Sequence, residues 1–151
     1  MLVHASCVSI DGAGVLLRGP PGSGKSDLAL RLIDGGGRLV SDDQVKLTKR
    51  GGRVLAEAPA EIAGRMEVRG VGIVKLDDGC FEPSPVALAL VCDLVRPDSV
   101  DRLPDAAHCD FLGISISLIA LAPFEASAVA KLRLVVNALK RDSVGALLDR
   151  I

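Results

Sequence analysis

Eight residues near the N-terminus have the types and spacing of a phosphate-binding loop. Residues 19–26 read Gly19-Pro20-Pro21-Gly22-Ser23-Gly24-Lys25-Ser26 and fit the pattern G-x-x-x-x-G-K-S/T at every fixed position. In such a loop the backbone N–H groups surround a phosphate, the lysine reaches the outer phosphates, and the hydroxyl ligates Mg²⁺. The sequence therefore predicts that residues 19–26 bind a nucleotide phosphate chain, with Lys25 as the phosphate-contacting cation and Ser26 as a metal ligand.

The elements on either side of this loop fit the same interpretation. Residues 14–17 read as a short buried strand, and residues 26–33 read as a helix in which Asp27 and Arg31 have i,i+4 spacing. The helix is expected to stop at Asp34, before three consecutive glycines. A phosphate loop joins a buried strand to a helix N-terminus, as here. The alternative is a surface turn rich in Gly and Pro.

Three further groups of residues could place charge near the loop. Residues 38–41 read as a buried strand that ends in Asp42-Asp43, an arrangement that brings a carboxylate to Mg²⁺ and to the attacking nucleophile; the alternative is a simple turn. Residues 66–75 hold two close glycines in an apolar run, which predicts a loop with Glu67 and Arg69 directed to one surface, or alternatively a salt-bridged strand edge. His4 falls on the first predicted strand, either near the loop or simply hydrogen-bonded in the sheet.

Composition limits the classes of protein to which the chain can belong. With 151 residues, 49% hydrophobic and 25% charged, it is expected to form one globular domain. A net charge of −1 gives no reason to expect nucleic acid or an anionic membrane as the main partner. There is neither a signal peptide nor an apolar run long enough to span a bilayer, so a cytoplasmic protein is expected. The four scattered cysteines are expected to be free thiols, and the scarcity of aromatic residues predicts loose selectivity for the nucleotide base.

The remaining pattern predicts an α/β fold, a single P-loop domain with a mixed β-sheet. Residues 2–10 should pair with residues 14–17 through the Asp11-Gly12 turn, and residues 44–49 with residues 53–58. Residues 87–95 form a long apolar run typical of a central strand. Residues 96–110 are polar and are expected to form a loop that carries His108 and Cys109. Residues 111–116 and 118–121 are read as the last two strands, and residues 126–148 as an amphipathic helix that closes the core or docks a partner.

Taken together, four features resemble the HPr kinase/phosphorylase family, whose members phosphorylate a serine of the phosphocarrier protein HPr and reverse the reaction with inorganic phosphate. They are His4, the phosphate loop, Asp42-Asp43, and Glu67-Val68-Arg69-Gly70-Val71-Gly72-Ile73, which fits the signature E-I/V-R-G-x-G-I/V. The resemblance covers nearly all of residues 1–151 and corresponds to the catalytic domain without the family's usual N-terminal domain, a short form similar to that of alphaproteobacteria. It implies an architecture like the nucleotide-binding domain of phosphoenolpyruvate carboxykinase, and a homo-oligomer, often a hexamer.

The resemblance also implies a role for each site residue, with ATP and Mg²⁺ as cofactors and an HPr-like carrier as partner. The catalytic set would be His4, Lys25, Asp43 and Arg102, and Asp43 would take the serine proton in the forward direction and return it in reverse. Glu67 would be the second Mg²⁺ ligand after Ser26. Asp42 would lie beside Asp43, and Arg69 would belong to the signature loop.

Two departures from the family pattern leave part of the function open. The phosphate loop has Pro21-Gly22 where the family usually has serine and glycine, and residues 122–126 lack the arginine of the family's P-G-R-N-like loop. These differences bear on the phosphorylase direction and on the usual docking of HPr. Two other functions therefore stay open. One is a small-molecule kinase, for which Arg96 and Arg102 are the available lid arginines, and the other is a regulatory module that senses a nucleotide or phosphate without transfer.

Overall fold

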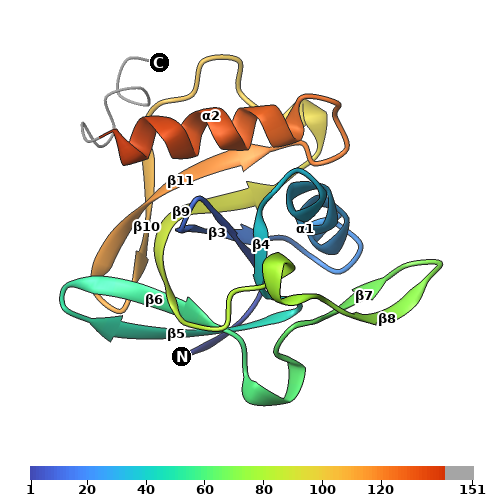
Figure 1. The fold of residues 1–151 in the computed structure, drawn as a ribbon. Coiled ribbons are helices and arrows are strands. Elements are labelled where there is room, and N and C mark those ends of the chain that lie inside the picture. Colours follow the sequence, from blue (N-terminus) through green and yellow to red (C-terminus); the bar gives the residue numbers. More distant parts are fainter. Residues whose placement is uncertain (142–151) are drawn as a thin grey trace.

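The computed structural model describes residues 1–141, which form a strongly curled mixed sheet with two α-helices on one side (Figure 1). The predicted α/β class and mixed sheet are therefore confirmed. The helices are α1 (Lys25–Asp34) and α2 (Ala128–Lys140), and short 3-10 turns cover Ala60–Ile62, Asp78–Cys80 and Pro97–Ser99. The strands are β1 (Leu2–His4), β2 (Ser6–Ile10), β3 (Ala13–Arg18), β4 (Arg38–Ser41), β5 (Gln44–Arg50), β6 (Arg53–Glu57), β7 (Arg65–Val68), β8 (Gly72–Lys75), β9 (Val86–Leu94), β10 (Ala107–Phe111) and β11 (Ile114–Leu121).

Strand β9 is the centre of the sheet, as its long apolar run predicts. It pairs in parallel with β3 on one side and with β11 on the other, and its first residues also pair with β6 in antiparallel orientation. From β3 the sheet continues through β2 to β4, and from β6 through β5 to β1. Because β3 and β4 flank β2, the loop after β3 and the acidic residues after β4 leave the sheet near each other.

Two apolar clusters stabilise the fold. One lies between the sheet and the helices, where Leu28 and Leu32 of α1 and Leu132 of α2 are fully buried. The other fills the concave side of the curled sheet and includes Leu16, Leu47 and Val91, which are also fully buried. Burying one such side chain contributes about 1.5–3 kcal/mol, so these clusters fix the positions of β3 and α1 and hence of the loop between them.

Helix α2 closes the core, which decides between the two alternatives for the amphipathic helix. Its Arg133 guanidinium donates to the Gly35 carbonyl at 2.5 Å, and the Lys140 ammonium donates to the Asp11 carbonyl at 2.6 Å. On α1 the predicted i,i+4 pair is present, with Arg31 Nε 3.1 Å from Asp27 Oδ2. The part of the predicted helix beyond residue 141 lies outside the described residues.

Several boundaries differ from the prediction. The first predicted strand is two strands, which are separated at Ala5. They pair with different partners: β1 with β5, and β2 with β3 and β4. The loop predicted at residues 66–75 is the β7–β8 hairpin. His108 and Cys109, expected in a loop, lie on β10, and the last two strands turn at Leu112-Gly113, so that β11 is one strand. In each case strand pairing, which short-range pattern does not contain, decides the boundary.

Candidate active site

Residues 19–26, the predicted phosphate loop, run from the end of β3 to the first turn of α1, so the predicted strand–loop–helix order is present. Gly22 and Gly24 have φ values of 81° and 101°, a left-handed region that favours glycine. The loop closes on itself through a hydrogen bond from Ser23 N to the Pro20 carbonyl at 3.0 Å. Gly24 caps α1 without a side-chain partner, so the first N–H groups of the helix are directed out of its N-terminal end.

This loop has the features that a phosphate group requires. The Lys25 ammonium donates to the carbonyls of Gly19 at 2.6 Å and Pro20 at 3.1 Å, which holds a cation against the loop. Within residues 1–141 the buried Ser23 hydroxyl oxygen has no hydrogen-bond partner. The free N–H groups and the positive end of α1 favour an anion here. The residues present therefore fit a nucleotide phosphate chain.

Asp42 links the phosphate loop to two other parts of the chain. The residue is buried, with 6% of its surface exposed. Its Oδ1 accepts from the Ser26 hydroxyl at 2.7 Å and from the Ser6 hydroxyl at 3.0 Å, and its Oδ2 accepts from the Glu67 backbone N–H at 3.1 Å. Hydrogen bonds to a charged acceptor are stronger than neutral ones, so this carboxylate fixes the start of α1 relative to β7.

Asp43, the adjacent residue, is in the opposite environment. It is exposed and has a φ of 69°, and it forms the centre of a three-residue turn in which Gln44 N donates to the Asp42 carbonyl at 2.8 Å. The Asp43 carbonyl accepts from Ala5 N at 3.1 Å, which ties the turn to the break between β1 and β2. A left-handed non-glycine residue held on both sides is a strained feature that often marks a functional position.

The third part of the site is the β7–β8 hairpin, which projects from the domain in Figure 1. Met66 is buried against α1 and anchors the hairpin, whereas the flanking residue Glu67 is exposed, as expected for alternating strand faces. The turn of the hairpin carries Arg69, and the Val71 N–H donates back to the Val68 carbonyl at 2.9 Å. The hairpin thus carries one carboxylate and one guanidinium to the edge of the phosphate loop.

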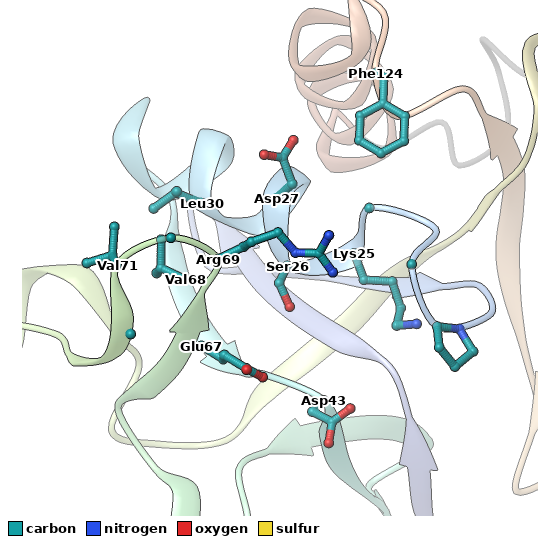
Figure 2. Close-up of a pocket in the computed structure, with 15 residues that line it drawn as sticks. Lys25, Ser26, Asp27, Leu30, Asp43, Glu67, Val68, Arg69, Val71 and Phe124 are labelled. Carbon is teal, nitrogen blue, oxygen red and sulfur yellow. The ribbon is translucent and has the colours of Figure 1, made fainter.

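These parts enclose one pocket of about 720 Å³, a volume typical of a nucleotide-sized ligand. Figure 2 shows Ser26 near its centre, with Glu67 and Asp43 on one side, Lys25 at the loop, and the Arg69 side chain extending above Ser26. The lining is Pro21, Gly22, Gly24, Lys25, Ser26, Asp27, Leu30, Asp43, Glu67, Val68, Arg69, Gly70, Val71, Gly72 and Phe124. Eight predicted site residues therefore meet here: five of the loop, two carboxylates and one arginine, namely Pro21, Gly22, Gly24, Lys25, Ser26, Asp43, Glu67 and Arg69.

The oxygen donors at this pocket are the type that Mg²⁺ prefers. Within residues 1–141 no three carboxylate, histidine or cysteine side chains lie close enough to form a metal site by themselves. Mg²⁺ is usually held by one or two carboxylates together with substrate phosphates. The Ser26 hydroxyl, Asp42 behind it and Glu67 across the pocket fit that mode.

Two predicted catalytic residues do not line the pocket. His4 is exposed at the end of β1, where it pairs with Gln44, the residue after Asp43. Arg102 is exposed in the segment between Pro97–Ser99 and β10. Conversely, Leu30 and Phe124 line the pocket although the sequence gives no signal for them, because one comes from α1 and the other from the turn after β11.

A model of the HPr serine kinase C-terminal domain matches residues 1–132. The chain belongs to this family. The family membership predicted from His4, the phosphate loop, the paired aspartates and the Glu67–Ile73 signature is confirmed.

Relatives of the HPr serine kinase family support the same assignment. An HPr kinase/phosphorylase of Clostridium beijerinckii is 42% identical over 121 residues, covering 76% of this chain and 40% of its own length. One from Bordetella pertussis is 34% identical over 151 residues, covering 94% of this chain and 48% of its own length. The chain therefore spans less than half the length of these relatives. The structure of the HPr(Ser) kinase/phosphatase from Coxiella burnetii matches with a TM-score of 0.82 and 28% identity, covering 93% of this chain and 92% of that chain.

None of the helices in residues 1–141 of this family member is long and apolar enough to cross a membrane.

Proposed function

We propose that this chain is an ATP- and Mg²⁺-dependent protein-serine kinase that phosphorylates an HPr-like phosphocarrier protein. The observation that carries the proposal is that residues of the 19–26 loop, including Ser26, meet the exposed Asp43 and the hairpin residue Glu67 at one pocket. These are the parts that phosphoryl transfer uses: a phosphate cradle, Mg²⁺ ligands and a carboxylate at the nucleophile. The names of the relatives supply the acceptor, HPr.

Asp43 is the group proposed to act on the acceptor. The serine hydroxyl oxygen would form a bond to the γ-phosphorus, the bond to the oxygen bridging the β- and γ-phosphates would break, and the serine proton would pass to the Asp43 carboxylate. An exposed carboxylate on a held, left-handed turn can both orient the hydroxyl and accept its proton. The products are phosphoserine and ADP.

The other residues of the pocket are proposed to hold charge. Lys25, the N–H groups at the start of α1 and Arg69 would bind the phosphates, and Ser26 with Glu67 would ligate Mg²⁺, which supplies neutralisation of charge between the phosphates. Asp42 would orient the Ser26 hydroxyl from behind. By family resemblance, His4 beside the Asp43 turn would act as the active-site histidine and Arg102 as the catalytic arginine.

Transfer of a labelled γ-phosphate to HPr-like proteins tests this function directly. The wild-type chain should label a serine of the carrier only with Mg²⁺ present, and Asp43→Asn should remove the labelling while Mg·ADP binding stays within a few-fold of wild type. Binding of Mg·ADP without any transfer would support the sensing module instead, and transfer to a small metabolite would support the small-molecule kinase. Equal turnover in Asp43→Asn would contradict the role given to Asp43.

Adding inorganic phosphate to the phosphorylated carrier tests the reverse reaction. Phosphorolysis in the family's manner would return the serine and release pyrophosphate. Pro21 in the loop and the lack of arginine in residues 122–126 are the two departures from the family pattern that bear on this reverse direction.

A further inference from the structure

Phe124 is the only aromatic side chain among the described residues that line the pocket. The residue is 70% exposed, although its ring lies against Gly24 of the phosphate loop. A Cβ atom built on Gly24 would lie only 2.8 Å from Cζ of this ring, so the ring occupies the space that any side chain at position 24 would need. Figure 2 shows the ring at the edge of the pocket, above Ser26.

The turn that carries Phe124 is held in place on both sides. It follows β11 and places Pro123 and Phe124 at its two central positions, where proline favours the backbone angle of the first. The Arg31 guanidinium of α1 donates to the Pro123 carbonyl, and the Lys131 ammonium lies 3.1 Å from Glu125. The backbone that carries the ring is therefore held in place before any ligand binds, which reduces the entropy lost on binding.

The direction of phosphoryl transfer shows which part of a nucleotide reaches this ring. The attacking and leaving oxygens lie roughly in line, so the acceptor must approach the γ-phosphate from the side away from the rest of the nucleotide. Asp43 marks the acceptor side. Figure 2 places Phe124 and Asp43 on opposite sides of Ser26, so the nucleoside end is directed away from Asp43, toward the side where Phe124 lies.

We propose that Phe124 is the surface on which the base of the bound nucleotide stacks, an inference that rests on the proposed function. Stacking on an aromatic ring holds any base, because every base has a π-face. Few side chains are available to read a base edge: the chain has one Asn and one Gln, and neither lines the pocket. Of the charged residues in the lining, Asp27 is paired with Arg31, and Arg69 is proposed to bind the phosphates. The site should therefore bind adenine and guanine nucleotides with similar affinity and favour purines over pyrimidines through their larger stacking area.

The test compares two ligands that differ only in the nucleoside. Binding of Mg·ADP and of Mg·pyrophosphate is measured by calorimetry for wild type, Phe124→Ala, Phe124→Trp and Leu134→Ala. Leu134 is a matched control, since it is an exposed apolar residue of α2 outside the pocket. Phe124→Ala should weaken Mg·ADP about tenfold, within the range that alanine substitution gives for a base stacked on an aromatic side chain. Mg·pyrophosphate should bind equally to all four proteins. Phe124→Trp should bind Mg·ADP with the affinity of wild type.

Each other outcome overturns a defined part of the argument. Equal weakening of both ligands in Phe124→Ala would mean that the ring shapes the phosphate loop and does not contact the base. Unchanged Mg·ADP affinity in Phe124→Ala, with wild-type binding intact, would refute the stacking proposal alone. A wild-type protein that binds neither ligand would instead refute the proposed function. A preference for ADP over GDP greater than about 100-fold would show hydrogen-bond reading of the base and would also refute the stacking proposal.

Discussion

Asp42 and Asp43 are adjacent carboxylates in opposite environments, and the same isosteric change should affect them in opposite ways. Asp42→Asn should lower stability and weaken binding of Mg·ADP, because the buried carboxylate accepts three hydrogen bonds and holds the Ser26 hydroxyl. Asp43→Asn should leave stability and Mg·ADP binding nearly unchanged and should abolish phosphoryl transfer. Asparagine tolerates the left-handed backbone of position 43, and the residue is exposed. The free energy of unfolding of Asp43→Asn should therefore stay within about 0.5 kcal/mol of wild type.

The size of the Asp42 effect follows from its partners. In Asp42→Asn the amide oxygen can still accept from the Glu67 N–H, and the amide nitrogen can donate to the two hydroxyls, which rotate. Each of three bonds then changes from charge-assisted to neutral, a loss of about 1 kcal/mol per bond. A neutral amide is also easier to bury than a carboxylate, which offsets part of that loss and leaves a net destabilisation of about 1–2 kcal/mol.

Thermal and denaturant unfolding of the two variants measure this difference. For a domain of this size each kcal/mol lowers the melting temperature by about 2–4 °C, so Asp42→Asn should melt about 2–8 °C below wild type. Asp43→Asn should have the same melting temperature as wild type. Two variants of equal stability would refute the reasoning, since burial and hydrogen bonding would then not distinguish the two carboxylates.

Three other predictions concern charge and thiols. Lys25→Ala should weaken Mg·ADP binding by at least about tenfold in calorimetry, because the only pocket cation held by the loop is lost. Arg69→Ala should weaken binding, whereas Arg102→Ala should slow transfer with binding unchanged; the reverse pattern would exchange their roles. Burial raises the pKa of the Cys7 and Cys92 thiols to about 12. A thiol reagent should therefore label the half-buried Cys80 and Cys109 before it labels Cys7 and Cys92. Since unfolded thiols ionise near 9.0, stability should be full below that pH and fall as the pH rises toward 12.

The local elements around the phosphate loop could be predicted from the sequence. The glycine and proline pattern, the helix with its Asp27–Arg31 pair and its stop at Asp34, and the strand ending in Asp42 are all encoded within short stretches. Short-range periodicity and capping signals are sufficient for such elements. The family could also be predicted, because its signature is contiguous from Glu67 to Ile73.

The division of labour between Asp42 and Asp43 could not be predicted in this way. Their residue types are identical and they are neighbours in the chain, so only the contacts of Ser6, Ser26 and the Glu67 N–H distinguish the buried member from the exposed one. Those partners are 36, 16 and 25 positions away from Asp42.

The sequence by itself therefore determined the local elements and the candidate residues for phosphate and Mg²⁺, since these candidates follow from residue type and short spacing. Tertiary structure alone decided which of them share a pocket: it brought Arg69 and Phe124 to the phosphate loop and left His4 and Arg102 outside the lining. The physical reason is that proximity across a sheet depends on strand order and on the packing of the β7–β8 hairpin against α1. Neither is contained in the spacing of residues along the chain.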